Sequence, residues 1–122
     1  MEEMDFKFDF EKLKVYQKSL DFIHEIFKIY KRLPREYKYT VGGNLARAGV
    51  SIANNIAEGS GKKSKKEKSR YYSIFLDSTR ECISVFNVLL HEELLDKNSY
   101  LKMRIGGKEI TNMLFGLIEL LE

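Results

Sequence analysis

Six basic residues crowd the nine positions from Lys62 to Arg70, and they are the strongest sign of binding chemistry in this 122-residue sequence. They are Lys62, Lys63, Lys65, Lys66, Lys68 and Arg70, and the only acid among them is Glu67. Six positive charges against one negative charge give this window +5, whereas the whole chain carries +3, so the remaining residues are together acidic. The basic character of the chain is therefore local.

A helix is expected to begin inside this basic window, at Ser64. The positive end of a helix dipole disfavours cations, and its free backbone N–H groups attract anions. A bound polyanion would relieve both effects. The window therefore predicts a surface that binds nucleic acid, either RNA or DNA, or another polyanion.

A second polar group lies in the otherwise apolar segment 40–58. Projected at about 100° per residue, its polar residues share one narrow stripe, which consists of Arg47, Ser51, Asn54, Asn55 and Glu58. A half-buried arginine needs a carboxylate partner, because leaving a buried charge unpaired costs several kcal/mol. We therefore expect a structural network of Arg47, Asn55, Glu58 and Glu81, with Arg47 paired to Glu81. The alternative is a ligand-binding or catalytic cluster.

The other reactive residue types do not assemble into a catalytic or metal site. A di-iron site in a helix bundle needs two Glu-x-x-His pairs, but the nearest match is a lone Asp21-x-x-His24. Cys82 is the single cysteine, and its place on an apolar arc predicts an inert, buried thiol. Gly59-Ser60-Gly61 lacks the spacing of a phosphate-binding loop. We expect a protein that is not an enzyme and that uses no metal or cofactor.

Helices must position these residues, because apolar residues recur at spacings of three and four and no alternating strand pattern occurs. Pro34, the only proline, ends the first helix, and Gly59 suits the left-handed position that follows a helix. Ser64 with Glu67 predicts a capping box, and Asp96 predicts a second cap. The expected helices span about residues 10–32, 40–58, 64–92 and 97–121.

These helices predict an all-α fold, because short loops between long helices favour an antiparallel, up-down-up-down four-helix bundle. The bundle would occupy residues 10–122 as one domain, after an acidic extension at residues 1–9. The helix at residues 40–58 is apolar around most of its circumference, which indicates burial on more than one side. We therefore expect a homo-oligomer; a monomer with an unusually apolar surface is the alternative.

No stretch of the chain approaches the roughly 20 apolar residues of a membrane-spanning helix, so no membrane association is expected. The acidic start of the chain is the opposite of a secretory signal. The single cysteine suits a reducing compartment. A soluble, cytoplasmic protein is the expectation.

Two motifs carry a resemblance to a known family. They are Leu13-Lys-Val-Tyr-Gln17 and the stretch from Leu45 to Gly61, which contains Arg-Ala-x-x-Ser-Ile-x-x-Asn-Ile-Ala-Glu-Gly at residues 47–59. The chain resembles the small bacterial four-helix bundle proteins called intervening-sequence proteins, because some are encoded inside large-subunit ribosomal RNA genes. The likeness extends to Met113-Leu114-x-Gly116-Leu117-Ile118. It departs from the family pattern at residues 39–44 and at Asp77-Ser78.

The resemblance implies a homopentameric ring without established enzymatic activity. Relatives of the family include the accessory variability proteins of diversity-generating retroelements, which bind nucleic acid and a reverse transcriptase. Two hypotheses follow for this chain. It is either an oligomeric nucleic-acid-binding adaptor, with a protein partner such as a reverse transcriptase, or a purely structural or protein-interaction module whose lysines only keep it soluble.

Overall fold

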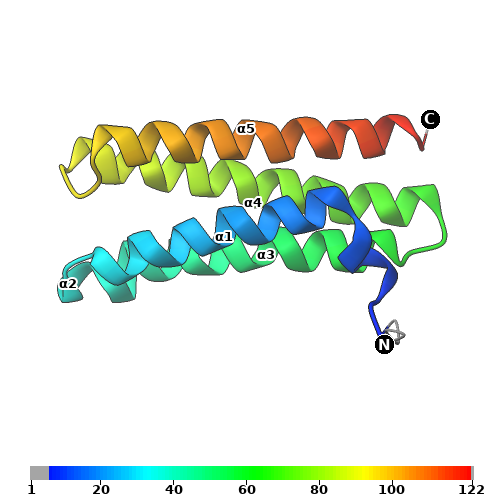
Figure 1. Ribbon diagram of the computed structural model, residues 1–122, viewed down its shortest axis with the longest axis horizontal. Helices are drawn as coiled ribbons and strands as arrows, with labels where there is room; N and C mark the ends of the chain where they lie inside the picture. Colours follow the sequence, from blue (N-terminus) through cyan, green and yellow to red (C-terminus); the bar gives the residue numbers. More distant parts are fainter. Residues whose placement is uncertain (1–5, 122) are drawn as a thin grey trace, which may run out of the picture.

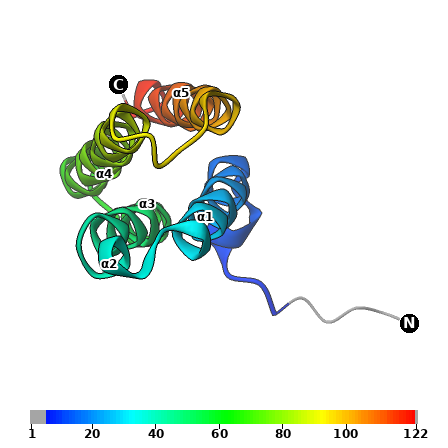
Figure 2. The same ribbon diagram turned by 90° about the vertical axis from the view of Figure 1, so that its left-hand side faces the viewer.

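The computed structural model describes residues 6–121, which fold into a bundle of long helices joined by short turns (Figure 1). The long helices are α1 (Lys14–Arg32), α3 (Gly43–Ser60), α4 (Lys65–His91) and α5 (Lys97–Glu119). Consecutive long helices run in opposite directions, and the view along the bundle shows one helix at each corner of a square (Figure 2). The predicted all-α, up-down-up-down four-helix bundle is confirmed.

Shorter helical pieces lead into α1 and α3. A 3-10 helix, Asp9–Lys12, precedes α1, so the α-helix expected from residue 10 begins only after the extended Leu13. Between α1 and α3 lie the short α2 (Arg35–Tyr37) and a π-helix, Lys38–Gly42. Sequence patterns predicted neither piece, because both depend on how the chain turns back onto the bundle after Pro34.

Both predicted N-terminal caps are present. The Ser64 hydroxyl accepts a hydrogen bond from the backbone N–H of Glu67 at 3.1 Å, and the Asp96 carboxylate accepts one from that of Ser99 at 2.9 Å. Hydrogen bonds from Ser99 lower the pKa of Asp96 below its usual value. The Glu67 carboxylate lies 3.5 Å from the Ser64 hydroxyl. It therefore does not complete the reciprocal half of a capping box.

Gly59 does not occupy the left-handed conformation that its sequence position predicted. Helix α3 continues through Ser60, and the only left-handed residue among residues 6–121 is Glu93, with φ 60°, just after α4. Gly59 is instead a packing residue. A Cβ atom there would lie 2.8 Å from Cε1 of Tyr72 and 2.9 Å from Cβ of Tyr71, so only glycine lets α3 and α4 approach this closely.

The core runs the length of the bundle and receives large side chains from every long helix. Fully buried examples are Ile26 of α1, Ile52 of α3, Phe86 of α4 and Leu114 of α5. The rings of Phe22 and Phe86 meet edge to face, with centroids 6.2 Å apart. Within residues 6–121, no helix has the length and hydropathy needed to cross a membrane.

Candidate functional site

The predicted basic window, residues 62–70, forms one end of the bundle. It covers the turn between α3 and α4 and the first turns of α4, at the end where α1 starts and α5 finishes (Figure 1). We call Lys62, Lys63, Lys65, Lys66, Lys68 and Arg70 the polybasic segment. The backbone N–H groups of Lys65 and Lys66 have no carbonyl one turn earlier in α4 to bond. The segment thus combines side-chain cations with free backbone donors.

Three of the six basic side chains already have interactions within the protein. The Lys68 ammonium donates to the backbone oxygen of Ser60 at 2.8 Å, which caps the negative C-terminal end of α3. The Lys62 ammonium and the Arg70 guanidinium lie 5.2 and 5.0 Å from the centre of the Tyr71 ring, within cation–π range. These three cations are partly committed to the fold.

The other three cations, Lys63, Lys65 and Lys66, are exposed. None of them makes a hydrogen bond, an ion pair or a ring contact with the part of the chain that the structure describes. Glu67 lies between them in sequence but is turned towards Ser64. The sequence could not separate these three cations from the other three, because the partners of Lys62 and Lys68 belong to other elements or depend on the turn.

The structure contradicts the predicted pairing of Arg47 with Glu81. The Arg47 guanidinium is exposed and donates to the Oδ1 atom of Asn44, three residues earlier on α3, at 2.7 Å. Glu81 and Glu58 are also exposed, and neither is within ion-pair distance of a cation among residues 6–121. Arg47 remains solvated on the rim of the bundle, so burial does not force it to find a carboxylate.

A smaller, neutral network occupies the contact between α3 and α4. The Asn55 amide donates to the backbone oxygen of Ser51 at 2.8 Å and to its hydroxyl at 3.0 Å. The Ser51 hydroxyl in turn lies 2.8 Å from that of the buried Ser78 on α4. Of the four predicted network residues, only Asn55 takes part. Two sequence features could have predicted the contact between the other two members. Ser51 lies on the same polar stripe as Asn55, and Ser78 is a small polar residue among apolar ones.

Comparison with known proteins places this geometry in a family. Residues 11–116 match the family described as 23S rRNA-intervening sequence protein. The chain belongs to this family. It is also similar to the solved structure of a protein of unknown function from the S23 ribosomal protein family of Bacteroides thetaiotaomicron. That match has 27% sequence identity and a TM-score of 0.79, and it covers 86% of this chain and 95% of the other. No protein with a curated description matches the chain.

The exposed Arg47 of this intervening-sequence protein yields a prediction about stability. Arg47→Ala should change the free energy of unfolding by less than about 0.5 kcal/mol, because the side chain is solvated and its partner Asn44 stays solvated without it. Ser51→Ala is the comparison variant and should cost about 1–2 kcal/mol, since it leaves the buried Ser78 hydroxyl without this partner and removes one of the two hydrogen bonds of the Asn55 amide. Urea unfolding followed by circular dichroism measures both. A loss of about 3 kcal/mol or more for Arg47→Ala would mean that a charge partner is supplied by another chain.

The remaining candidate groups are the Cys82 thiol, which is buried, and the possible metal ligands, which do not cluster among the described residues. Burial, with a smaller contribution from the nearby Glu81 charge, raises the pKa of the Cys82 thiol to about 12, so the thiol stays protonated, as the apolar arc predicted. Among the described residues, no three His, Cys, Asp or Glu side chains gather closely enough to hold a metal ion. The polybasic segment is therefore the predicted site residue set that the structure leaves open to a ligand.

Proposed function

We propose that this intervening-sequence protein is a non-enzymatic, cytoplasmic, oligomeric binding protein that binds RNA or DNA through its polybasic segment. One observation carries the proposal. Lys63, Lys65 and Lys66 are exposed and unpaired within residues 6–121, at the N-terminus of a 27-residue helix. Like charges and the helix dipole both oppose this placement, and phosphate groups would relieve both.

The chemistry of the segment favours a phosphate backbone over a defined base sequence. Lysines contact phosphates as point charges and release the counterions condensed on the strand. Lys62 and Arg70 flank Tyr71 and extend the positive surface along α4. Binding should therefore be largely independent of base sequence and steeply dependent on salt.

Self-association would multiply this surface, and exposed apolar side chains support it. Gly49 of α3 packs against Ile26 of α1. The residue after each of them is partly exposed: Val50 of α3 is 40% exposed, and Phe27 of α1 is 38% exposed. Leu20 lies two turns before Phe27 on the same face and is 46% exposed. We propose that a second copy of the chain covers this strip. A ring of five copies, as the family resemblance implies, would repeat the polybasic segment around one rim.

A structural or protein-interaction module is the second candidate function. The same apolar strip supports it, because such a strip buries as well against a partner protein as against another copy. In that case the lysines only keep the assembly soluble. A protein partner such as a reverse transcriptase is compatible with either function, and nucleic-acid binding separates the two.

The test is a titration of the full chain with single-stranded RNA and DNA at several salt concentrations. If Lys63, Lys65 and Lys66 engage phosphates, the log-log salt slope should be roughly −2 for each engaged subunit. Changing these three residues together to Gln should reduce the slope by about that amount without lowering thermal stability, because it removes like charges from a helix N-terminus. Fluorescence anisotropy measures the affinity.

The matched control changes three exposed cations at the opposite end of the bundle, Lys31, Arg35 and Lys97, to Gln. It lowers the net charge equally and should leave the slope close to that of the parent protein. An unchanged slope in the polybasic variant would place the nucleic-acid site on another surface. Failure of the parent protein to bind either strand at low salt would leave the structural module as the better function.

A further inference from the structure

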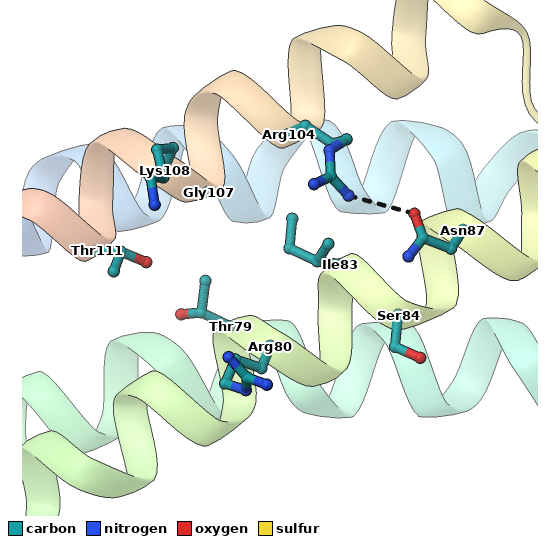
Figure 3. A pocket seen from close by; sticks show the side chains of 9 residues that line it. All are labelled: Thr79, Arg80, Ile83, Ser84, Asn87, Arg104, Gly107, Lys108 and Thr111. Carbon is teal, nitrogen blue, oxygen red and sulfur yellow. Dashed lines mark hydrogen bonds between the residues drawn. The ribbon is translucent and has the colours of Figure 1, made fainter.

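A second positive surface lies far from the polybasic segment, in a groove between α4 and α5. The groove has a volume of about 430 Å³, and Figure 3 shows Arg80 on α4 and Arg104 and Lys108 on α5 among the residues that line it. No Asp or Glu lines it. Arg80 follows Lys65 by 15 positions on α4, which separates the two surfaces by about 22 Å along the helix.

Two acidic side chains near this part of the bundle are engaged on the other side of α5, where it contacts α1. On α5, Glu109 pairs with Lys18 of α1 at 3.9 Å. Glu25 of α1 receives Lys102 of α5 at 3.2 Å, and the hydrogen bond from Lys102 lowers the pKa of Glu25. Glu109 and Glu25 are thus paired in the α1–α5 contact, and Asp77 and Glu81 of α4 are exposed but do not line the groove. The α4–α5 side of the same helix is left with a net positive charge.

Arg104 is already held in position by neutral groups. Its Nη1 atom donates to Oδ1 of Asn87 and to the hydroxyl of Tyr100, each at 3.3 Å. Its guanidinium lies 5.6 Å from the centre of the Tyr100 ring, and the Tyr100 hydroxyl donates to Asn87 at 2.6 Å. The other guanidinium nitrogens remain available to an anion. A cation fixed in advance loses less conformational entropy when it binds.

Arg80 and Lys108 have no hydrogen bond or ion pair with residues 6–121, and both are exposed. Between them, Thr79, Ile83 and Thr111 lie in the space separating the two helices (Figure 3). Ile83 is the single large apolar side chain in the lining, and no aromatic side chain lines the groove. The groove therefore offers cations, hydroxyl groups and an amide, but no wide apolar wall for an aromatic ring.

We propose that the α4–α5 groove binds a sugar phosphate. A phosphate monoester brings nearly two negative charges for Arg80, Arg104 and Lys108, and the sugar hydroxyls match lining groups such as Ser84 and Thr111 that both donate and accept hydrogen bonds. The volume suits a small ligand of this size. The ligand is either a free sugar phosphate or one unit of a nucleic-acid backbone, whose phosphodiester offers the same oxygen acceptors with a single negative charge. The proposal does not depend on the polybasic segment.

The test uses ribose 5-phosphate on the full chain, followed by calorimetry and by the NMR signal of the Ile83 δ1 methyl group. Ribose 5-phosphate should bind saturably, inorganic phosphate more weakly, and ribose not at all. The Ile83 methyl signal should move during the titration. The signal of Ile52, which is fully buried in α3, should not move. Absence of saturable binding, or an Ile83 signal that stays in place, would overturn the proposal.

Matched variants separate the groove from general charge. Arg80→Gln combined with Lys108→Gln should weaken ribose 5-phosphate binding by about tenfold or more, because each charged hydrogen bond contributes measurably to affinity. Lys65→Gln combined with Lys66→Gln removes the same charge from the polybasic segment and should leave the affinity unchanged. Parent-like binding by the groove variant would refute the site.

A competing strand identifies the source of the ligand. If a short oligouridylate displaces ribose 5-phosphate in the Lys65→Gln, Lys66→Gln variant, the groove takes a backbone unit. If it does not, the groove takes the free sugar phosphate. Both results support the site. If the groove does not bind ribose 5-phosphate at all, the proposed nucleic-acid binding by the polybasic segment is unaffected, because the two surfaces share no residue.

Discussion

Gly59→Ala is expected to lower the free energy of unfolding by about 1–2 kcal/mol, although alanine is the better helix former. A Cβ atom at this position meets Tyr72 at 2.8 Å and the Cβ of Tyr71 at 2.9 Å. The Tyr71 atom is attached directly to the backbone of α4, so it cannot rotate away. The two helices would have to separate, and that overpacking outweighs the gain of about 1 kcal/mol in helix propensity.

Gly116→Ala is the matched control, because Gly116 lies in α5 with no heavy atom within 4 Å of its virtual Cβ. This variant should raise the free energy of unfolding by about 0.5–1 kcal/mol. Chemical denaturation of both variants and the parent protein measures the change in the free energy of unfolding, which should be negative for Gly59→Ala and positive for Gly116→Ala. Equal effects at the two positions would show that the α3–α4 contact is looser than the geometry at Gly59 indicates.

Leu20→Glu combined with Val50→Glu is expected to convert the proposed oligomer into single chains. Both side chains are about half exposed in one chain, so the bundle itself should tolerate the change. In an interface between copies, each new carboxylate would be buried without a partner, at a cost of several kcal/mol for each subunit. Light scattering coupled to size exclusion measures the mass, and circular dichroism checks that the helices remain.

Ile105→Glu serves as the control for assembly, because Ile105 is 71% exposed on α5, whereas the strip consists of residues of α1 and α3. It should leave the mass of the oligomer unchanged. Dissociation by Ile105→Glu alone would place the interface on α5. A parent protein with the mass of one chain across micromolar concentrations would refute self-association altogether.

Periodicity, capping residues and short loops were enough to predict the four long helices and their antiparallel order. Ser64 and Asp96 mark helix starts by a local rule, in which a side-chain oxygen accepts a backbone N–H three residues later. The role of Gly59 was not accessible in this way. A glycine near the end of a helical pattern fits both a left-handed cap and a close helix contact, and only the position of Tyr71 decides between them.

The candidate sites show where local patterns stop being informative. The polybasic segment could be predicted because its basic residues are close together in the sequence. The partner of Arg47 could not be predicted, since a solvated side chain bonds to the nearest acceptor, here Asn44. The α4–α5 groove joins two polar stripes with the same spacing, Arg80-Ser84-Asn87 and Arg104-Lys108-Thr111. Each stripe alone looks like an ordinary solvated helix face. They come together because Ile83 packs against Gly107 and because Tyr100 and Arg104 hydrogen-bond to Asn87 across the helix contact.

The buried Cys82 makes this chain a convenient host for site-specific probes. It is the single cysteine, and burial raises the pKa of its thiol to about 12. At neutral pH the protonated, buried thiol should therefore not react with maleimide reagents. A thiol introduced by Lys63→Cys, at an exposed and unpaired position, would then be the only reactive one. Fluorophores or spin labels attached there could report distances between copies in the proposed oligomer without first removing the native cysteine.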